Sequence, residues 1–150
     1  MREIKFRGRN INSGGWTYGD LIQLIGDQGQ GRKFIVNNRF GACFDHEGNF
    51  INTESPFVNE VAPETVGQYT GLKDKNGVEI YEGDLCRGDN SEYQIVWVDD
   101  CAKFGAKVVG SEYVLPRGCT FPMQHYVNRS DTTKCVFEVI GNICEGEGKQ

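Results

Sequence analysis

The chain has 150 residues, a formal net charge of −5, 38% hydrophobic residues and 25% charged residues. This length suits one domain with its own core, and the composition excludes a disordered chain. No stretch approaches the ~18 apolar residues of a membrane helix, and no apolar segment of a secretion signal follows the first residues. We therefore expect a protein that stays in the cytoplasm where it is made and makes no membrane contact.

Glycine, cysteine and charge are unevenly used. The 20 glycines are nearly twice the usual ~7% share, which favours turns and short strands over helices. The six cysteines are expected to be reduced and mostly buried, because the cytoplasm does not maintain disulfides. Residues 51–100 carry three basic and eleven acidic side chains, a net charge of −8. Residues 1–50, in contrast, carry seven basic and five acidic side chains.

The first predicted strand is MREIKFRGR, in which Ile4 and Phe6 alternate with Lys5 and Arg7. This period of two predicts a half-buried strand with a basic outer face. Two further strands are predicted at 16–26, with a bulge or turn at Gly19-Asp20, and at 33–37. The glycine-rich segment 26–32 is expected to be the hairpin loop between them.

The middle of the chain has the clearest turn signals. A connecting segment with one short strand is expected over 49–63, and we place a soft internal boundary near Pro63. Asn76-Gly77 predicts a two-residue type I′ hairpin turn, because both central positions of that turn need positive φ. Glu82-Gly83-Asp84 predicts a second tight reversal.

The remainder also reads as strands. EYQIVWVDD, residues 92–100, is apolar on both faces and predicts a central strand that is covered on both sides. Shorter strands are predicted at 102–110 and 112–115, and a long strand with a kink is predicted at 135–143. One short helix is expected near 120–130.

Enzymatic chemistry has weak support in this sequence. Asp74, Glu79, Glu82 and Asp84 could hold an acid/base pair, but solvated turn carboxylates explain them better. A Cys-His dyad remains open, because such partners meet in space and not in sequence. Cys43 and His46, with Cys119 and His125, could form a Cys₂His₂ zinc site, although the second spacing is loose. We expect no catalytic residues, no metal and no cofactor.

Nucleic-acid binding is a further alternative. Basic and aromatic side chains near the amino terminus could form a stacking and phosphate-binding surface, as in small β-barrels. The competing interpretation is an edge strand whose charges discourage aggregation. The acidic middle of the chain also argues against a broad basic footprint. The residues of this candidate surface are Arg2, Lys5, Arg7, Arg9 and Trp16, with Tyr18 beside them.

Three segments carry a family resemblance. MREIKFRGRN, TVGQYTGLKDKNGVEIYEGDL and FEVIGNICE, in this order and at these spacings, resemble the YopX family of bacteriophage and prophage proteins. The chain departs from the family pattern in 26–32, in 101–133 and at Cys144. The resemblance implies a mainly β, phage-encoded protein of the bacterial cytoplasm that has no established activity and no catalytic residues to transfer.

Together these features predict an all-β protein. We expect a single YopX-like domain, 1–150, made of two packed β subdomains: an N-terminal half, 1–63, and a second half, 64–150. The Gly-Asp-apolar sequence before a Val-Trp-Val strand makes the second half similar to a small SH3-like barrel. The expected function is a non-enzymatic interaction or regulatory module that binds a host or phage protein or forms a homo-oligomer. A nucleic-acid-binding barrel is the alternative, and a hydrolase built around Asp84 ranks third.

Overall fold

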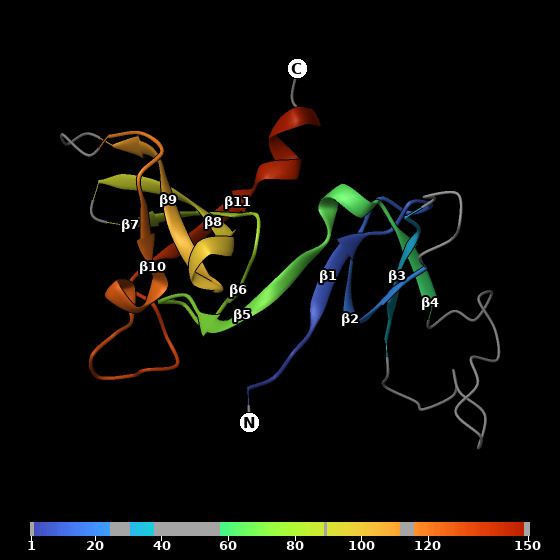
Figure 1. Ribbon diagram of the computed structural model, residues 1–150, viewed down its shortest axis with the longest axis horizontal. Coiled ribbons are helices and arrows are strands. Elements are labelled where there is room, and N and C mark those ends of the chain that lie inside the picture. Colours follow the sequence, from blue (N-terminus) through green and yellow to red (C-terminus); the bar gives the residue numbers. More distant parts are fainter. Residues whose placement is uncertain (1, 25–30, 38–57, 89, 112–115, 149–150) are drawn as a thin grey trace. The chain divides into compact units, whose positions relative to one another are not determined.

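The computed structural model describes residues 2–24, 31–37, 58–88, 90–111 and 116–148 (Figure 1). Within these ranges the regular structure consists of β-strands and short 3-10 helices, so the predicted all-β class is confirmed. None of the described helices has the length and apolar character needed to cross a membrane. The chain forms two compact units, Glu3–Gln68 and Tyr69–Gln150, and the second includes Met1–Arg2. The two units divide within one strand, β5.

The N-terminal unit is an antiparallel sheet in the order β4-β3-β2-β1. Its strands are β1 (Phe6–Arg9), β2 (Trp16–Gln23), β3 (Lys33–Val36) and β4 (Val58–Val61), and β1 also pairs with the start of β5 (Gly67–Lys73). β2 changes partner at Gly19-Asp20, since Gly19 lies opposite Phe6 of β1 and Asp20 lies opposite Val36 of β3. The expected bulge or turn is therefore a switch between neighbouring strands.

The C-terminal unit contains a five-stranded antiparallel sheet in the order β10-β9-β8-β7-β11 (Figure 1). Its strands are β7 (Asp84–Gly88), β8 (Ser91–Val98), β9 (Lys103–Ser111), β10 (Thr120–Pro122) and β11 (Glu138–Asn142). The later part of β5 pairs with β6 (Glu79–Tyr81), and the chain then enters the sheet through β7. Short 3-10 helices lie at Pro63–Thr65, Asp99–Cys101, Met123–Tyr126 and Ile143–Gly148.

One face of the five-stranded sheet carries the main core. Alternate residues of β7, β8 and β9 point to this face, as the period of a strand requires. The buried members are Ile80, Cys86, Tyr93, Ile95, Phe104, Ala106, Val108, Met123, Cys135 and Phe137. Tyr93, Tyr126 and Phe137 pack ring to ring, with centroid separations between 4.4 and 5.3 Å. A smaller cluster in the N-terminal unit joins Phe34, Val36 and Val58.

Several expectations need correction. The C-terminal sheet is open in the described ranges, because its two edge strands, β10 and β11, do not pair with each other. The SH3-like barrel is therefore not confirmed. β8 is central, as predicted, but only one of its faces is buried, with Tyr93 and Ile95, whereas Gln94 and Val96 of the other face are half-buried. Antiparallel sheets commonly leave one face solvated. The expected short helix is the 3-10 segment Met123–Tyr126, and the strand predicted at 112–115 lies outside the described residues.

Candidate functional site

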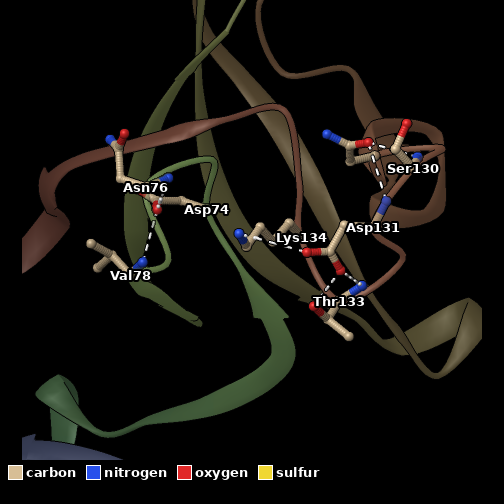
Figure 2. Close-up of polar contacts among 8 residues, drawn as sticks. Asp74, Asn76, Val78, Ser130, Asp131, Thr133 and Lys134 are labelled. Atoms are coloured by element: carbon tan, nitrogen blue, oxygen red, sulfur yellow. Dashed lines mark hydrogen bonds and ion pairs between the residues drawn. The ribbon is translucent and has the colours of Figure 1, made fainter.

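Asp74 is the centre of the first turn of the central motif. Its carboxylate is 1% exposed, and its Oδ1 accepts hydrogen bonds from the backbone N–H groups of Asn76 and Val78, both at 2.8 Å (Figure 2). Its Oδ2 accepts a third bond, at 3.1 Å, from the backbone N–H of Val139 in β11. The turn interpretation of this carboxylate therefore holds, but its expected solvation is wrong, because backbone amides take the place of water.

The hairpin predicted at Asn76-Gly77 is present with a different turn. Gly77 has φ +87°, and the described non-glycine residues with positive φ are Asn90 and Ala102. Gly77 N–H donates to the carbonyl of Asp74 at 3.0 Å, and Asp74 N–H donates to the carbonyl of Val78 at 2.7 Å. This is a three-residue loop that ends in a left-handed glycine, so the type I′ prediction is wrong. The Asp74 carboxylate favours this loop, because it accepts hydrogen bonds from the backbone amides of Asn76 and Val78 and holds them in place.

Asp84 plays the same part in the second turn. It is 1% exposed, and its Oδ2 accepts a hydrogen bond from Tyr81 N–H at 2.8 Å. The side-chain amide of Asn142 donates to its Oδ1 at 3.5 Å. Gly83 has φ +87°, and its carbonyl accepts a bond from Ile143 N–H at 2.9 Å. Asp84, like Asp74, is therefore buried instead of solvated, and both carboxylates connect the central motif to the C-terminal motif.

The other carboxylates of this motif are less enclosed. Glu79 accepts a hydrogen bond from the hydroxyl of Tyr81 at 2.8 Å, and Glu82 is half-buried in the turn. The turn residues predicted from the sequence, Asn76, Gly77, Glu82, Gly83 and Asp84, therefore occupy two tight reversals that flank β6. In the structure these residues form and stabilise the two backbone turns.

Thiol and metal chemistry find little support among the described residues. Burial raises the pKa of the Cys135 thiol to about 11, and the nearby Asp74 carboxylate adds to the increase. A thiol with this pKa stays protonated near neutral pH and is a poor nucleophile. In the described ranges no group of three or more His, Cys, Asp or Glu side chains could hold a metal ion. Cys43 and His46 of the considered zinc site lie outside these ranges.

The predicted basic face is only partly assembled. The guanidinium carbon of Arg7 lies 4.5 Å from the centre of the Trp16 ring, and that of Arg9 lies 5.8 Å from it. Arg7 is nevertheless 7% exposed, whereas Ile4 is 60% exposed, so the predicted alternation is wrong. Arg7 packs against the Trp16 ring, because β1–β2 pairing places Arg7, Trp16 and Tyr18 on the same face of the sheet.

The remaining members of that face are placed differently. Lys5 forms an ion pair with Glu3 at 3.3 Å. The Nε of Arg9 donates to the carbonyl of Gly14 at 3.0 Å. Arg2 belongs to the C-terminal unit, where its side chain lies next to Gly71. The structure thus brings Arg7, Arg9 and Trp16 together, whereas Arg2 belongs to the other unit.

Sequence reasoning missed a pocket in the C-terminal unit. Its volume is about 550 Å³, and it lies where β7, β8 and β9 meet the loop after Lys134. Lys75 pairs with Glu138 at 2.8 Å, and Arg87 pairs with Glu92 at 2.8 Å. The bond with Glu92 and the charge of Glu138 raise the pKa of Arg87. The lining consists of Lys75, Arg87, Gly88, Asn90, Ser91, Glu92, Gly110, Ser111, Val136 and Glu138.

The residues that line this pocket do not form a recognisable motif in the sequence. The pocket depends on which residues of four strands lie opposite one another, and periodicity alone does not give that register. Ser91 and Ser111 lie opposite each other in β8 and β9, and their hydroxyl oxygens are 2.9 Å apart. The site combines two ion pairs, small polar residues and one apolar side chain, which is a composition suited to binding.

The comparison with protein families agrees with the motifs. The chain is similar over 99% of its length to a crystal structure of protein EF1440 from Enterococcus faecalis, with 22% identity, 98% coverage of that chain and a TM-score of 0.48. No curated protein matches the chain. The family model described as YopX protein matches residues 5–147. A match over nearly the whole chain shows that this protein belongs to the YopX family.

Proposed function

We propose that this protein is a non-enzymatic interaction or regulatory module, encoded by a phage or prophage, that binds a host or phage protein in the bacterial cytoplasm. The observation that supports this most directly is the environment of Asp74 and Asp84. Both carboxylates are buried and accept bonds from backbone and amide groups of the same unit. General acid–base catalysis needs a carboxyl within reach of a substrate proton. These two groups support turns, which also counts against a hydrolase built around Asp84.

The surface of the C-terminal unit supports binding. Val136 is 45% exposed and borders the charged pocket, so an apolar contact and a polar rim occur together. Protein interfaces combine apolar and charged groups in this way. Val78, Ile140 and Ile143 are further exposed apolar side chains of this unit. The edges of the sheet, β10 and β11, are where a second copy would add if the protein forms a homo-oligomer.

Affinity capture tests this proposal. Tagged protein is incubated with bacterial lysate that is divided into nuclease-treated and untreated halves, and a tag-only bait serves as the control. We expect one stoichiometric protein that survives nuclease and forms the same complex again from purified components. Light scattering of the protein alone tests the homo-oligomer. The proposal would be ruled out if light scattering shows a monomer and repeated captures retain no protein above the tag-only control.

Nucleic-acid binding is the second candidate, because Arg9, Trp16 and the 45% exposed Tyr18 share one face of the N-terminal sheet. A half-buried cation beside aromatic rings suits a single strand, whose bases stack and whose phosphates attract positive charge. The test is binding to single- and double-stranded DNA at several salt concentrations. Arg9→Gln should weaken binding and reduce its salt dependence, while Lys107→Gln, an exposed charge of the other unit, should not. Binding that does not weaken as the salt concentration rises, or no binding at all, would eliminate this candidate.

A further inference from the structure

Charged side chains of alternating sign form a row across the C-terminal sheet. The register places Glu138 of β11 opposite Arg87 of β7, Arg87 opposite Glu92 of β8, and Glu92 opposite Gly110 of β9. Arg87 pairs with Glu92, and Lys75 extends the row beyond Glu138 with a second ion pair. This charge row runs from Lys75 to Glu92 and then ends at a glycine.

Among the described residues, the position above Gly110 has room for a side chain. A Cβ atom built on Gly110 would lie 3.7 Å from the Oε2 of Glu92 and 3.8 Å from its Cβ, which are ordinary contact distances, and no other described residue beyond its chain neighbours lies closer. The Oε1 of Glu92 accepts the bond from Arg87, and none of the described residues donates a hydrogen bond to Oε2. A carboxylate can accept bonds at both oxygens. Glu92 therefore presents a second oxygen to the space above Gly110.

This space belongs to the pocket of about 550 Å³, which is within the roughly 300–1,000 Å³ range of ligand sites. Lys75, Arg87, Glu92 and Glu138 sum to no net charge, but the row ends on the anionic Glu92. The protein carries a net charge of −5, and residues 51–100 carry three basic and eleven acidic side chains. The negative charge of Glu92 at the end of the row and the negative net charge of the protein both favour the binding of a cation.

We infer that the pocket receives the side chain of a lysine or arginine from the partner protein, seated above Gly110 with its charged end on the Oε2 of Glu92. This inference rests on the proposed interaction function and names the chemistry of its contact. A guanidinium or ammonium there continues the alternation of the charge row by one member. The aliphatic stem of such a side chain can cover backbone at a glycine, which has no side chain in the way. Charge-assisted bonds from the cation hold it on the carboxylate.

The test uses the full chain, isotope-labelled, in NMR titrations with three capped tripeptides. The probes are acetyl-Gly-Arg-Gly-amide, its Lys counterpart and its Glu counterpart, all at low salt. We expect the Arg and Lys probes to shift the amide signals of Ser91, Glu92, Gly110 and Ser111 with affinities on the order of millimolar. Added salt should weaken these shifts, because half-exposed charges are screened. Equal shifts from the Glu probe, or shifts elsewhere only, would overturn the inference.

Matched variants show whether the charge row causes the binding. Glu92→Gln keeps the side-chain shape and should weaken binding of the Arg probe by at least about threefold. Gly110→Lys should place an internal cation on Glu92 and abolish the shifts, with the fold retained because the site has room for a side chain. Asp100→Asn makes the same change in net charge as Glu92→Gln at an exposed residue in the 3-10 turn after β8, and should leave binding unchanged.

The two proposals fail in different ways. If the tripeptides do not bind, or if Glu92→Gln and Asp100→Asn behave alike, the inference about the pocket is wrong. A captured partner that remains bound to Gly110→Lys would then preserve the interaction function and place its contact elsewhere. If parent protein captures no partner although the Arg probe shifts Gly110, the proposed function is wrong while the cation site stands.

Discussion

Replacing Asp74 by asparagine tests how much stability the first turn draws from its buried carboxylate. The substitution keeps the size of the side chain and replaces one oxygen by an NH₂ group. In the parent, three backbone N–H groups donate to the two carboxylate oxygens, from Asn76, Val78 and Val139. An amide has one acceptor oxygen, so in either orientation its NH₂ faces at least one of these donors. At least one of these part-buried N–H groups must then lose its bond to the carboxyl oxygen.

The expected cost follows from these contacts. An unsatisfied buried donor costs about 1–3 kcal/mol, and a bond to a charged acceptor exceeds a neutral one by about 1 kcal/mol. We therefore expect Asp74→Asn to lower the free energy of unfolding of the C-terminal unit by about 3 kcal/mol. For a chain of this size, that corresponds to a decrease of Tm by about 10 °C. Urea unfolding measures the change in free energy, and calorimetry measures the change in Tm.

Hydrogen exchange localises the effect. The amides of Val78 and Val139 should lose protection in Asp74→Asn, although they lie 61 positions apart in the sequence. Asp100→Asn, an exposed carboxylate that makes the same charge change, is the control and should stay within about 0.5 kcal/mol of the parent. An Asp74→Asn protein as stable as this control, with both amides still protected, would refute the role assigned to the carboxylate.

Two further predictions concern the hairpin and the core. Gly77→Val should destabilise by about 1–2 kcal/mol in urea unfolding, because φ +87° strains a β-branched residue, although no described residue beyond the chain neighbours lies within 4 Å of the new Cβ. Gly77→Asn should cost less. Equal unfolding midpoints for the parent and the Val variant would contradict the left-handed glycine. Cys135 should resist alkylation in the native protein at pH 8 while the exposed Cys101 and Cys119 react, because its pKa is raised to about 11. Mass spectrometry of native and urea-unfolded samples checks this, and rapid native labelling of Cys135 would contradict its burial.

Local signals in the sequence determined the strand-rich class and the places where the chain turns. Glycine after asparagine and glycine before aspartate specify reversals through the φ angles that they permit, and both reversals are present. The three motifs also identified the family, which the match over residues 5–147 confirms. The type of the first turn was not determined, because it depends on how the Asp74 side chain bonds to the backbone around it.

Tertiary structure decided what the charged residues do. Asp74 accepts a hydrogen bond from Val139, which lies far along the chain, and Arg7 packs against the Trp16 ring because β1–β2 pairing places both on one face. The charge row that ends at Gly110 exists only in the observed register of four strands. Turn preferences are properties of neighbouring residues and can be read from a sequence. Burial and cross-strand pairing join residues that are distant in the sequence, and they are defined only once the strands have aligned.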